Sequence, residues 1–398
     1  MKKYLMFFVS AILCLSLLSG CGSENATSQK STAIETKQAA AETPAVKETT
    51  STPKPTAAPK ATPKATATPT PTPTPTPEVT EEPTGDTGFY SPLSGLPTST
   101  DVSRKRPYIV MCDNSYLAVP HAGVSKSDMI IEMMEEGGIT RMMAFYMDPS
   151  GIPQLGPVRS ARAYNVYTAL GYQGFLVHAG GSKEADGLVA QYGLEDIDGI
   201  LGTFGNLFYR DQARVPNGAV HAFMISGDNA VNAAVNIGHY SLDQKEDYDV
   251  TYGLLFSDTA EEQCTEEASG EIVVTYNGGK TSRFYYDAEN EQYNFYEFGD
   301  PYVDEEGSPV PMKNVIMIYA NTFLQEDGLH LTIELTSGEG FFFTKGKVAH
   351  IQWYKDGPYD VFHYTLDDGT PLQLTPGRTF VAVNQTGGQG YQGSVSYN

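Results

Sequence analysis

Arginine is the residue type whose placement in this chain most clearly suggests a chemistry. Nine arginines lie in residues 89–398, and five of them fall between Arg141 and Arg214, within a strongly acidic sequence. Guanidinium groups hold carboxylate or phosphate through paired hydrogen bonds. The spacing therefore predicts an anion-binding site in this stretch.

A glycine-rich turn adds to this prediction. Gly180, Gly181 and Ser182 separate an expected strand from an expected helix, where backbone N–H groups are unpaired and the helix dipole favours an anion. The predicted ligand-binding residues are Arg141, Arg159, Ser160, Arg162, His178, Gly180, Gly181, Ser182, Arg210 and Asp211. The alternative is that the arginines form internal ion pairs with acids close in sequence, namely Glu135, Glu136, Asp186 and Asp211.

Two other interpretations of the polar and aromatic residues remain open. His178 with Asp113, Glu135 and Glu136 could supply the acid and base of a hydrolase, although the chain has no nucleophile elbow, HExxH or P-loop motif. Histidine spacing predicts no metal site, and nothing indicates a cofactor. Aromatic runs such as residues 284–286 and 293–296 could bind sugars or proteins, but we expect them to fill a β-domain core.

The N-terminus predicts a lipid anchor. Lys2 and Lys3 precede an apolar run from Tyr4 to Leu18, which is shorter than the roughly 20 residues that a membrane-spanning helix needs. The run leads into a lipobox, Leu-Ser-Gly-Cys, that ends at Cys21. We expect residues 1–21 to be a signal peptide and lipobox, with Cys21 lipidated and the rest of the chain held outside the cell membrane.

Residues 22–88 form an expected linker. They are rich in Thr, Pro, Ala and Lys and include five Thr-Pro pairs in residues 68–77. Such a composition cannot bury enough apolar surface to fold, so we expect a disordered spacer with extended polyproline character. A spacer of this kind suits a head that works at the cell wall, where an anionic wall fragment or an envelope protein is the expected partner.

The head, residues 89–398, is acidic and reads as two unlike halves. It contains 18 Lys or Arg against 40 Asp or Glu, which argues against nucleic acid as a partner. Residues 89–245 alternate strand and helix patterns and predict an α/β domain, whereas residues 246–398 predict a mostly antiparallel β domain. The fold class is therefore α+β. Cys112 and Cys264 could pair, but we expect two free thiols inside strands.

The predicted elements of the head can be stated by range. Strands are expected at 108–112, 128–134, 141–147, 174–178, 272–276, 283–286, 293–297, 315–319, 329–334, 341–343, 349–354 and 379–383. Helices are expected at 161–172, 183–192 and 228–237.

The order of short motifs in the head resembles the YerB family of bacterial lipoproteins. In the first half the motifs are 92–97 (PLSGLP), 106–107 (RP), 110–114 (VMCDN), 127–128 (SD), 135–141 (EEGGITR), 156–162 (GPVRSAR), 178–182 (HAGGS) and 209–211 (YRD). In the second half they are 284–287 (FYYD), 314–316 (NVI), 346–347 (GK), 353–355 (WYK) and 376–379 (PGRT). The resemblance implies an N-terminal domain of unknown function, a YerB-like C-terminal domain and a lipoprotein location, but no particular reaction. Members often carry a compact Pro-His-Asn where this chain has residues 216–221 (PNGAVH), so the resemblance assigns no role to His221.

Overall fold

The computed structural model describes residues 88–246, 248, 251–386 and 392–398, all within one compact unit. The expected signal peptide, Cys21 and nearly all of the linker lie outside these residues. In the part of the chain that is described, no helix is long and apolar enough to cross a membrane.

The first half builds a sheet with helical connections. Its strands are β1 (Tyr108–Asn114), β2 (Met129–Met134), β3 (Thr140–Tyr146), β4 (Phe175–His178) and β5 (Asp196–Asp198), in the order β2-β3-β1-β4-β5. The strands β1, β2 and β3 are buried along their whole length, as expected from their mostly apolar sequences. The strand β3 runs antiparallel to β1 and β2, whereas β4 and β5 continue parallel to β1, so the sheet is mixed.

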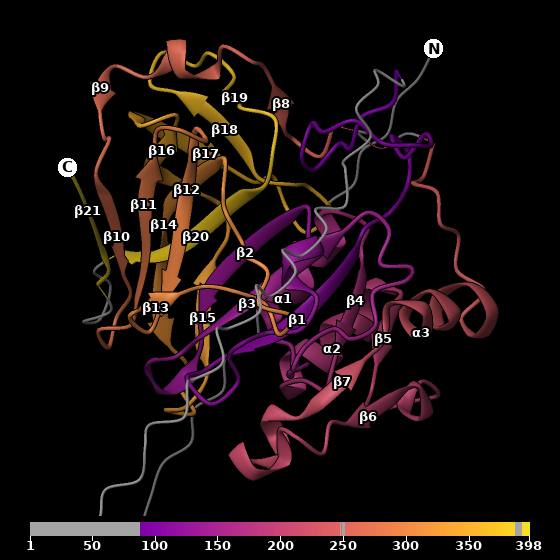
Figure 1. The fold of residues 1–398 in the computed structure, drawn as a ribbon. Helices are drawn as coiled ribbons and strands as arrows, with labels where there is room; N and C mark the ends of the chain where they lie inside the picture. Colours follow the sequence, from indigo (N-terminus) through magenta and orange to yellow (C-terminus); the bar gives the residue numbers. More distant parts are fainter. Residues whose placement is uncertain (1–87, 247, 249–250, 387–391) are drawn as a thin grey trace, which may run out of the picture. The chain divides into compact units, whose positions relative to one another are not determined.

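Helices follow the strands of the first half. The helix α1 (Ala163–Gly171) leads into β4, α2 (Lys183–Tyr192) joins β4 to β5, and α3 (Gly227–Asn232) continues as one π-helical turn, η6 (Ala233–Ile237). Figure 1 shows these helices gathered near β4 and β5, with the strands of the second half on the other side of β2. Short elements complete this half: η1 (Val124–Lys126), η2 (Glu136–Gly138), η3 (Gly205–Leu207), β6 (Phe208–Arg210), η4 (Val215–Asn217), η5 (Ala219–His221) and β7 (Phe223–Ile225).

The second half consists of strands and one 3-10 turn. These elements are β8 (Leu255–Phe256), η7 (Ala260–Gln263), β9 (Glu266–Glu267), β10 (Glu271–Thr275), β11 (Thr281–Asp287), β12 (Gln292–Glu297), β13 (Asp300–Pro301), β14 (Asn314–Leu324), β15 (Leu331–Glu334), β16 (Ser337–Thr344), β17 (Lys347–Tyr354), β18 (His363–Leu366), β19 (Gln373–Leu374), β20 (Thr379–Thr386) and β21 (Ser394–Tyr397).

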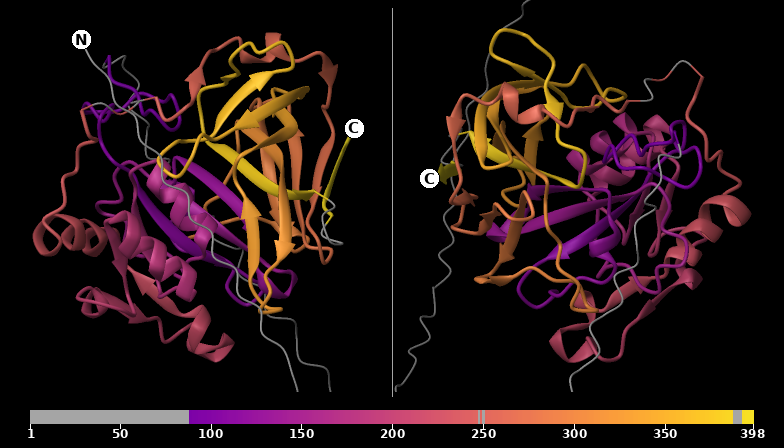
Figure 2. Two further views of the ribbon diagram at one scale, coloured as in Figure 1. Left: turned by 180° about the vertical axis from the view of Figure 1, so that it is seen from behind. Right: turned by 45° about the horizontal axis from the view of Figure 1, so that its top comes forward.

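One sheet runs through both halves of the head. The strand β20 lies between β14 and β2 and pairs in parallel with both, so the order continues as β18-β17-β16-β14-β20-β2-β3-β1-β4-β5. Figure 2 shows the yellow strand β20 meeting the indigo strands of the first half. Strands from both predicted domains thus share one sheet, and the predicted boundary at 245/246 stays a prediction.

A second, five-stranded sheet packs on the large one. Its order is β13-β12-β11-β10-β21, and β10 and β12 bury alternate residues, as expected for strands with one face on a core. The rings of Phe284 and Phe295, from this sheet, each lie 5.0 Å from the ring of Phe380 on β20. This part of the aromatic sequence therefore fills the core.

The α+β class is confirmed in its general form, and most element predictions differ from the structure only at their ends. The helix α2 has the predicted bounds, and the helix predicted at 228–237 is divided between α3 and η6. Several short strands had no prediction: β5–β9, β13, β18, β19 and β21. Both described cysteines are free; Cys112 lies in β1 as expected, but Cys264 follows η7 outside any strand, so that placement was wrong.

Candidate functional site

The end of β1 places polar side chains on both faces of the large sheet. Asp113 and Asn114 are consecutive residues of this strand, so their side chains point to opposite faces. Asp113 lies opposite Arg141 of β3, and Asn114 lies opposite Thr140. The sequence Asp-Asn at this strand end therefore supplies two separate polar clusters.

Asp113 contacts an arginine and a histidine from distant segments. Its Oδ2 atom accepts a hydrogen bond from Nδ1 of His221 at 2.7 Å and lies 3.4 Å from Nε of Arg159. The backbone explains the position of Arg159, because its N–H donates to Met111 and the N–H of Asp113 donates to Pro157, which lays residues 157–159 along β1. His221 belongs to η5 and reaches Asp113 over 108 residues of sequence.

The side chains of Arg159 and His221 are partly open to solvent. The Asp113 side chain is 2% exposed, whereas that of Arg159 is 24% and that of His221 is 15% exposed. Among the described residues, none hydrogen bonds to the two terminal nitrogens of Arg159 or to Nε2 of His221. A Cβ atom on Gly218, whose φ is 117°, would lie 3.6 Å from that Nε2, so glycine keeps it accessible. We call Asp113, Arg159 and His221 the Asp113 site.

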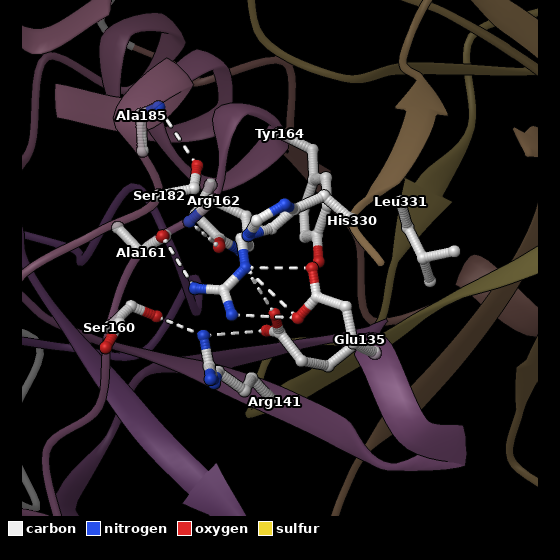
Figure 3. Close-up of polar contacts among 12 residues, drawn as sticks. Glu135, Arg141, Ser160, Ala161, Arg162, Tyr164, Ser182, Ala185, His330 and Leu331 are labelled. Atoms are coloured by element: carbon white, nitrogen blue, oxygen red, sulfur yellow. Dashed lines mark hydrogen bonds and ion pairs between the residues drawn. The ribbon is translucent and has the colours of Figure 1, made fainter. Parts of the chain in front are cut away.

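Two of the predicted arginines are committed to internal ion pairs. Arg141 lies 2.8 Å from Glu135, and Arg162 lies 2.7 Å from Glu135 and 2.8 Å from Glu136. Figure 3 shows both guanidinium groups turned toward Glu135, with Arg141 also donating to the backbone oxygen of Ser160. Arg141 and Arg162 therefore form internal ion pairs, as the alternative interpretation of the arginines predicted.

The pKa values of Glu135 and Glu136 are shifted in opposite directions. Burial raises the pKa of Glu135 well above its usual value, against the opposing effect of Arg141. Burial acts in the same direction on Glu136, but the hydrogen bond with Glu135 and the Arg162 guanidinium outweigh it and lower the pKa of Glu136 to about 2. These carboxyl groups are thus held by arginine and are poorly placed to serve as the acid and base of the hydrolase hypothesis.

The glycine-rich turn is also satisfied from within the protein. Gly180 donates its N–H to Asp198 at 2.8 Å, and the N–H of Ser182 donates to Ala161. The Ser182 hydroxyl caps α2 by accepting from the N–H of Ala185. A Cβ atom on Gly181 would lie 2.6 Å from an oxygen of Asp186, so the protein's own carboxylate already lies beside this helix start.

His178 uses both ring nitrogens inside the protein. Nδ1 donates to the oxygen of Gly180 and Nε2 to Asp196, each at 2.9 Å. Burial would lower the pKa of His178, but the hydrogen bonds to Asp196 and Gly180 raise it above the usual value. Ligand atoms of His178, Asp196 and Asp198 lie within 4.8 Å of one another. Both ring nitrogens of His178 are thus engaged by oxygens of the protein in this arrangement.

The remaining predicted residues lie in the β6–β7 hairpin and the loop that follows β6. Arg210 donates to the oxygen of Ala219 and stacks on Phe223, with 5.1 Å from its guanidinium carbon to the ring centre. Asp211 lies 3.7 Å from Arg214, which also donates to the backbone oxygens of Ala118 and Pro120. In each of the other four clustered arginines at least one terminal nitrogen hydrogen bonds to the protein. Arg159 is the one in which neither terminal nitrogen hydrogen bonds to a described residue.

On the opposite face of the sheet, Asn114 joins a buried polar network. We call it the Glu132 cluster: Asn114, Glu132, Thr140, Tyr276, Lys280, Ser282 and Glu297. The ammonium group of Lys280 bridges Glu132 and Glu297, lying 2.6 Å from the latter, and Asn114 donates to both carboxylates at 2.8 and 2.9 Å. The cluster connects β1 and β2 with the five-stranded sheet and is sealed from solvent, which makes it a structural feature.

The larger surface cavities lie away from these residues. Three of them have volumes of about 450, 430 and 290 Å³ and are lined around Tyr90 and Phe256, around Lys126 and Asp304, and around Arg106 and Gln244, respectively. None of the three is lined by a predicted site residue. The Asp113 site lies outside these three cavities, and its Arg159 and His221 side chains are partly exposed.

Comparison with known proteins identifies the family. Residues 93–238 match the model described as "Protein of unknown function (DUF3048) N-terminal domain", and residues 272–381 match the corresponding C-terminal domain. The chain belongs to the DUF3048 family. A relative in this family is "Putative lipoprotein YerB" of Bacillus subtilis (strain 168), 32% identical over 297 residues that cover 74% of this chain and 85% of the relative. The crystal structure of the YerB protein from Bacillus subtilis matches with a TM-score of 0.63 at 28% identity, over 77% of this chain and 99% of that chain. The predicted resemblance to YerB is thus confirmed.

The decisive partner in the Asp113 site was not among the predicted residues. His221 lies in a six-residue segment that departs from the family motif, and no local pattern relates it to Asp113. Asp113 itself was predicted, but with His178 as its partner. Sequence spacing gives no signal for such a pair, because chain folding alone brings η5 to the end of β1.

Proposed function

We propose that this chain is a lipid-anchored extracytoplasmic protein whose head binds an anionic group at the Asp113 site without catalysing a reaction. The lipobox at Cys21 and the lipoprotein name of the Bacillus subtilis relative support the anchor. An anionic wall fragment or an acidic region of an envelope protein is the proposed ligand class.

The observation that carries the binding proposal is the state of Arg159. Its Nε lies 3.4 Å from the buried carboxylate of Asp113, which also accepts from His221, and no described residue hydrogen bonds to its two terminal nitrogens. A charge held in place by a buried partner loses little conformational entropy on binding, and two adjacent donors can share one carboxylate or phosphate.

Binding of soluble wall fragments to the purified head tests this proposal. Arg159→Gln removes the charge and should weaken binding about tenfold or more, since a charge-assisted hydrogen bond contributes roughly 1.5–3 kcal/mol. Arg283→Gln is the matched control, because Arg283 is an exposed arginine on β11 that pairs with Glu271. Equal affinity of the two variants, with unchanged thermal unfolding, would refute the site.

Incorporation of radiolabelled palmitate tests the anchor separately. The full chain should be labelled and remain in the membrane fraction, and Cys21→Ala should be unlabelled and released in soluble form. Labelling that persists in the alanine variant would contradict lipidation at Cys21.

Hydrolysis of a wall glycan or peptide bond is the second candidate function, with His221 in place of His178. The specific observation is that Asp113 orients Nδ1 of His221 and leaves Nε2 open, which is the arrangement of a general base. Clearing of a purified wall suspension by the protein, lost in His221→Gln, would support hydrolysis. No clearing at protein concentrations that bind the wall would leave binding as the function.

A further inference from the structure

Exposed apolar side chains flank the Asp113 site on one side. Tyr116 is 68% exposed, Leu117 is 47% and Val220 is 49%. Their loops meet, because Asn217 donates to the oxygen of Leu117 and Ser115 lies 3.4 Å from Nδ1 of His221. The side of the Asp113 site formed by His221 therefore adjoins an exposed apolar surface.

A second exposed apolar segment lies near the backbone of Arg159. Ile200 and Leu201 follow β5 and are both more than half exposed. Ile200 packs against Gly180, whose neighbour Ala179 donates its N–H to the oxygen of Arg159. Exposed apolar residues thus follow both β1 and β5, the strands whose ends adjoin the Asp113 site.

The net negative charge of the head favours an anion with few negative charges at this site. Its 40 acidic and 18 basic side chains repel a polyanion, whereas a ligand with one negative charge is repelled far less. One guanidinium terminus and one imidazole can satisfy a single carboxylate. Because burial of apolar surface is favourable, an apolar surface beside them should strengthen the binding of a ligand that carries an apolar group close to that carboxylate.

We propose that the Asp113 site binds the C-terminal carboxylate of a peptide whose last residues are apolar, which specifies the anion of the proposed function and rests on it. The carboxylate accepts hydrogen bonds from the terminal nitrogens of the Arg159 guanidinium, and the His221 imidazole, held by the same carboxylate of Asp113, forms the neighbouring part of the site. The apolar side chains of the peptide pack on Leu117 and Val220.

Two pools of fluorescein-labelled tetrapeptides test the inference by fluorescence anisotropy. Both pools vary the last two positions over Ala, Val, Leu and Phe; one ends in a free carboxylate and the other in a carboxamide. We expect the free-acid pool to bind about tenfold more tightly than the carboxamide pool, because the carboxamide cannot form the charge-assisted hydrogen bonds.

Variants separate the apolar from the ionic contribution. Leu117→Ser should weaken binding of the free-acid pool about threefold to tenfold, since it removes an apolar contact of roughly 1 kcal/mol. Leu329→Ser is the matched control, because Leu329 is also an exposed leucine, 59% against 47% for Leu117, and lies in the loop before β15. Arg159→Gln should abolish the difference between the two pools.

Competition with inorganic phosphate and succinate distinguishes the failure of this inference from that of the proposed function. If phosphate or succinate binds in an Arg159-dependent manner while the two peptide pools bind equally, or Leu117→Ser has no effect, the inference is overturned and anion binding stands. If no anion responds to Arg159→Gln, both are overturned.

Discussion

The stability of the head should fall as the pH rises from 4.5 to 7, and Glu297 should cause much of this fall. Glu297 is buried beside Glu132, and Lys280 is the ammonium group shared between them. Burial raises the pKa of Glu297 from 4.5 to about 7, although Lys280 opposes the shift. The perturbation we propose is Glu297→Gln, which keeps an oxygen that can accept from Asn114 and Lys280 but removes the titration.

The sign and the size of the effect follow from this shift. A carboxyl group whose pKa is higher in the folded than in the unfolded state stabilises the fold fully below the unfolded pKa, and the contribution is lost as the pH rises through the folded pKa. A rise from 4.5 to about 7 corresponds to about 3 kcal/mol in the free energy of unfolding. The pKa of Glu132 is lowered by Lys280, despite burial, so Glu132 titrates below this window and its contribution stays constant.

Urea unfolding between pH 4.5 and 8 measures the effect. The free energy of unfolding of the native head minus that of Glu297→Gln should decrease by about 3 kcal/mol across this range and level off above pH 7. Glu271→Gln is the control, because its hydrogen bonds with Tyr285 and Arg283 lower the pKa of this exposed carboxyl group, so that it titrates below the window. A difference for Glu297→Gln that is independent of pH, or that increases with pH, would refute the account of the Glu132 cluster.

Three further changes test the packing, each by chemical unfolding at pH 7. Lys280→Met should destabilise the head by roughly 3–5 kcal/mol, because two buried carboxylates lose their cation; a loss below about 1 kcal/mol would show that the carboxylates are otherwise neutralised. Phe380→Ala should cost about 3–5 kcal/mol, since it opens a cavity between Phe284 and Phe295; a small loss would mean that the two sheets close over the gap. Ser182→Ala should cost about 1 kcal/mol by removing the cap of α2, whereas Ser182→Thr should retain most of the stability.

Local patterns in the sequence predicted the elements of the head well. The strands β1, β2 and β3 and the helix α2 have continuous apolar or amphipathic signatures, and these depend only on neighbours in the chain. Strands such as β5 and β9, with three and two residues, carry too few residues for such a signature. They exist because a neighbouring strand presents an edge with which they can pair.

The candidate site was predicted in part. The sequence pointed to Arg159 and to Asp113. It grouped Arg159 with Arg141 and Arg162, which pair with acids of the protein. It grouped Asp113 with His178, which contacts Gly180 and Asp196 instead. Glu135 illustrates the reason. It directly follows β2, and only the register of β3 and the start of α1 determine that it contacts both Arg141 and Arg162. Which charged side chains pair depends on their distances in the folded protein, and these distances cannot be read from their spacing along the chain.

The sequence by itself determined the lipobox motif, the linker composition, the acidic charge, the resemblance to the YerB family and the α+β class, because each depends on composition or short-range order. Only the tertiary structure decided that β20 joins the two halves into one sheet, and that His221 rather than His178 contacts Asp113. The physical reason is that parallel pairing and ion pairing between distant segments depend on which buried surfaces fit together. That fit is settled by the packing of the whole head rather than by any one segment.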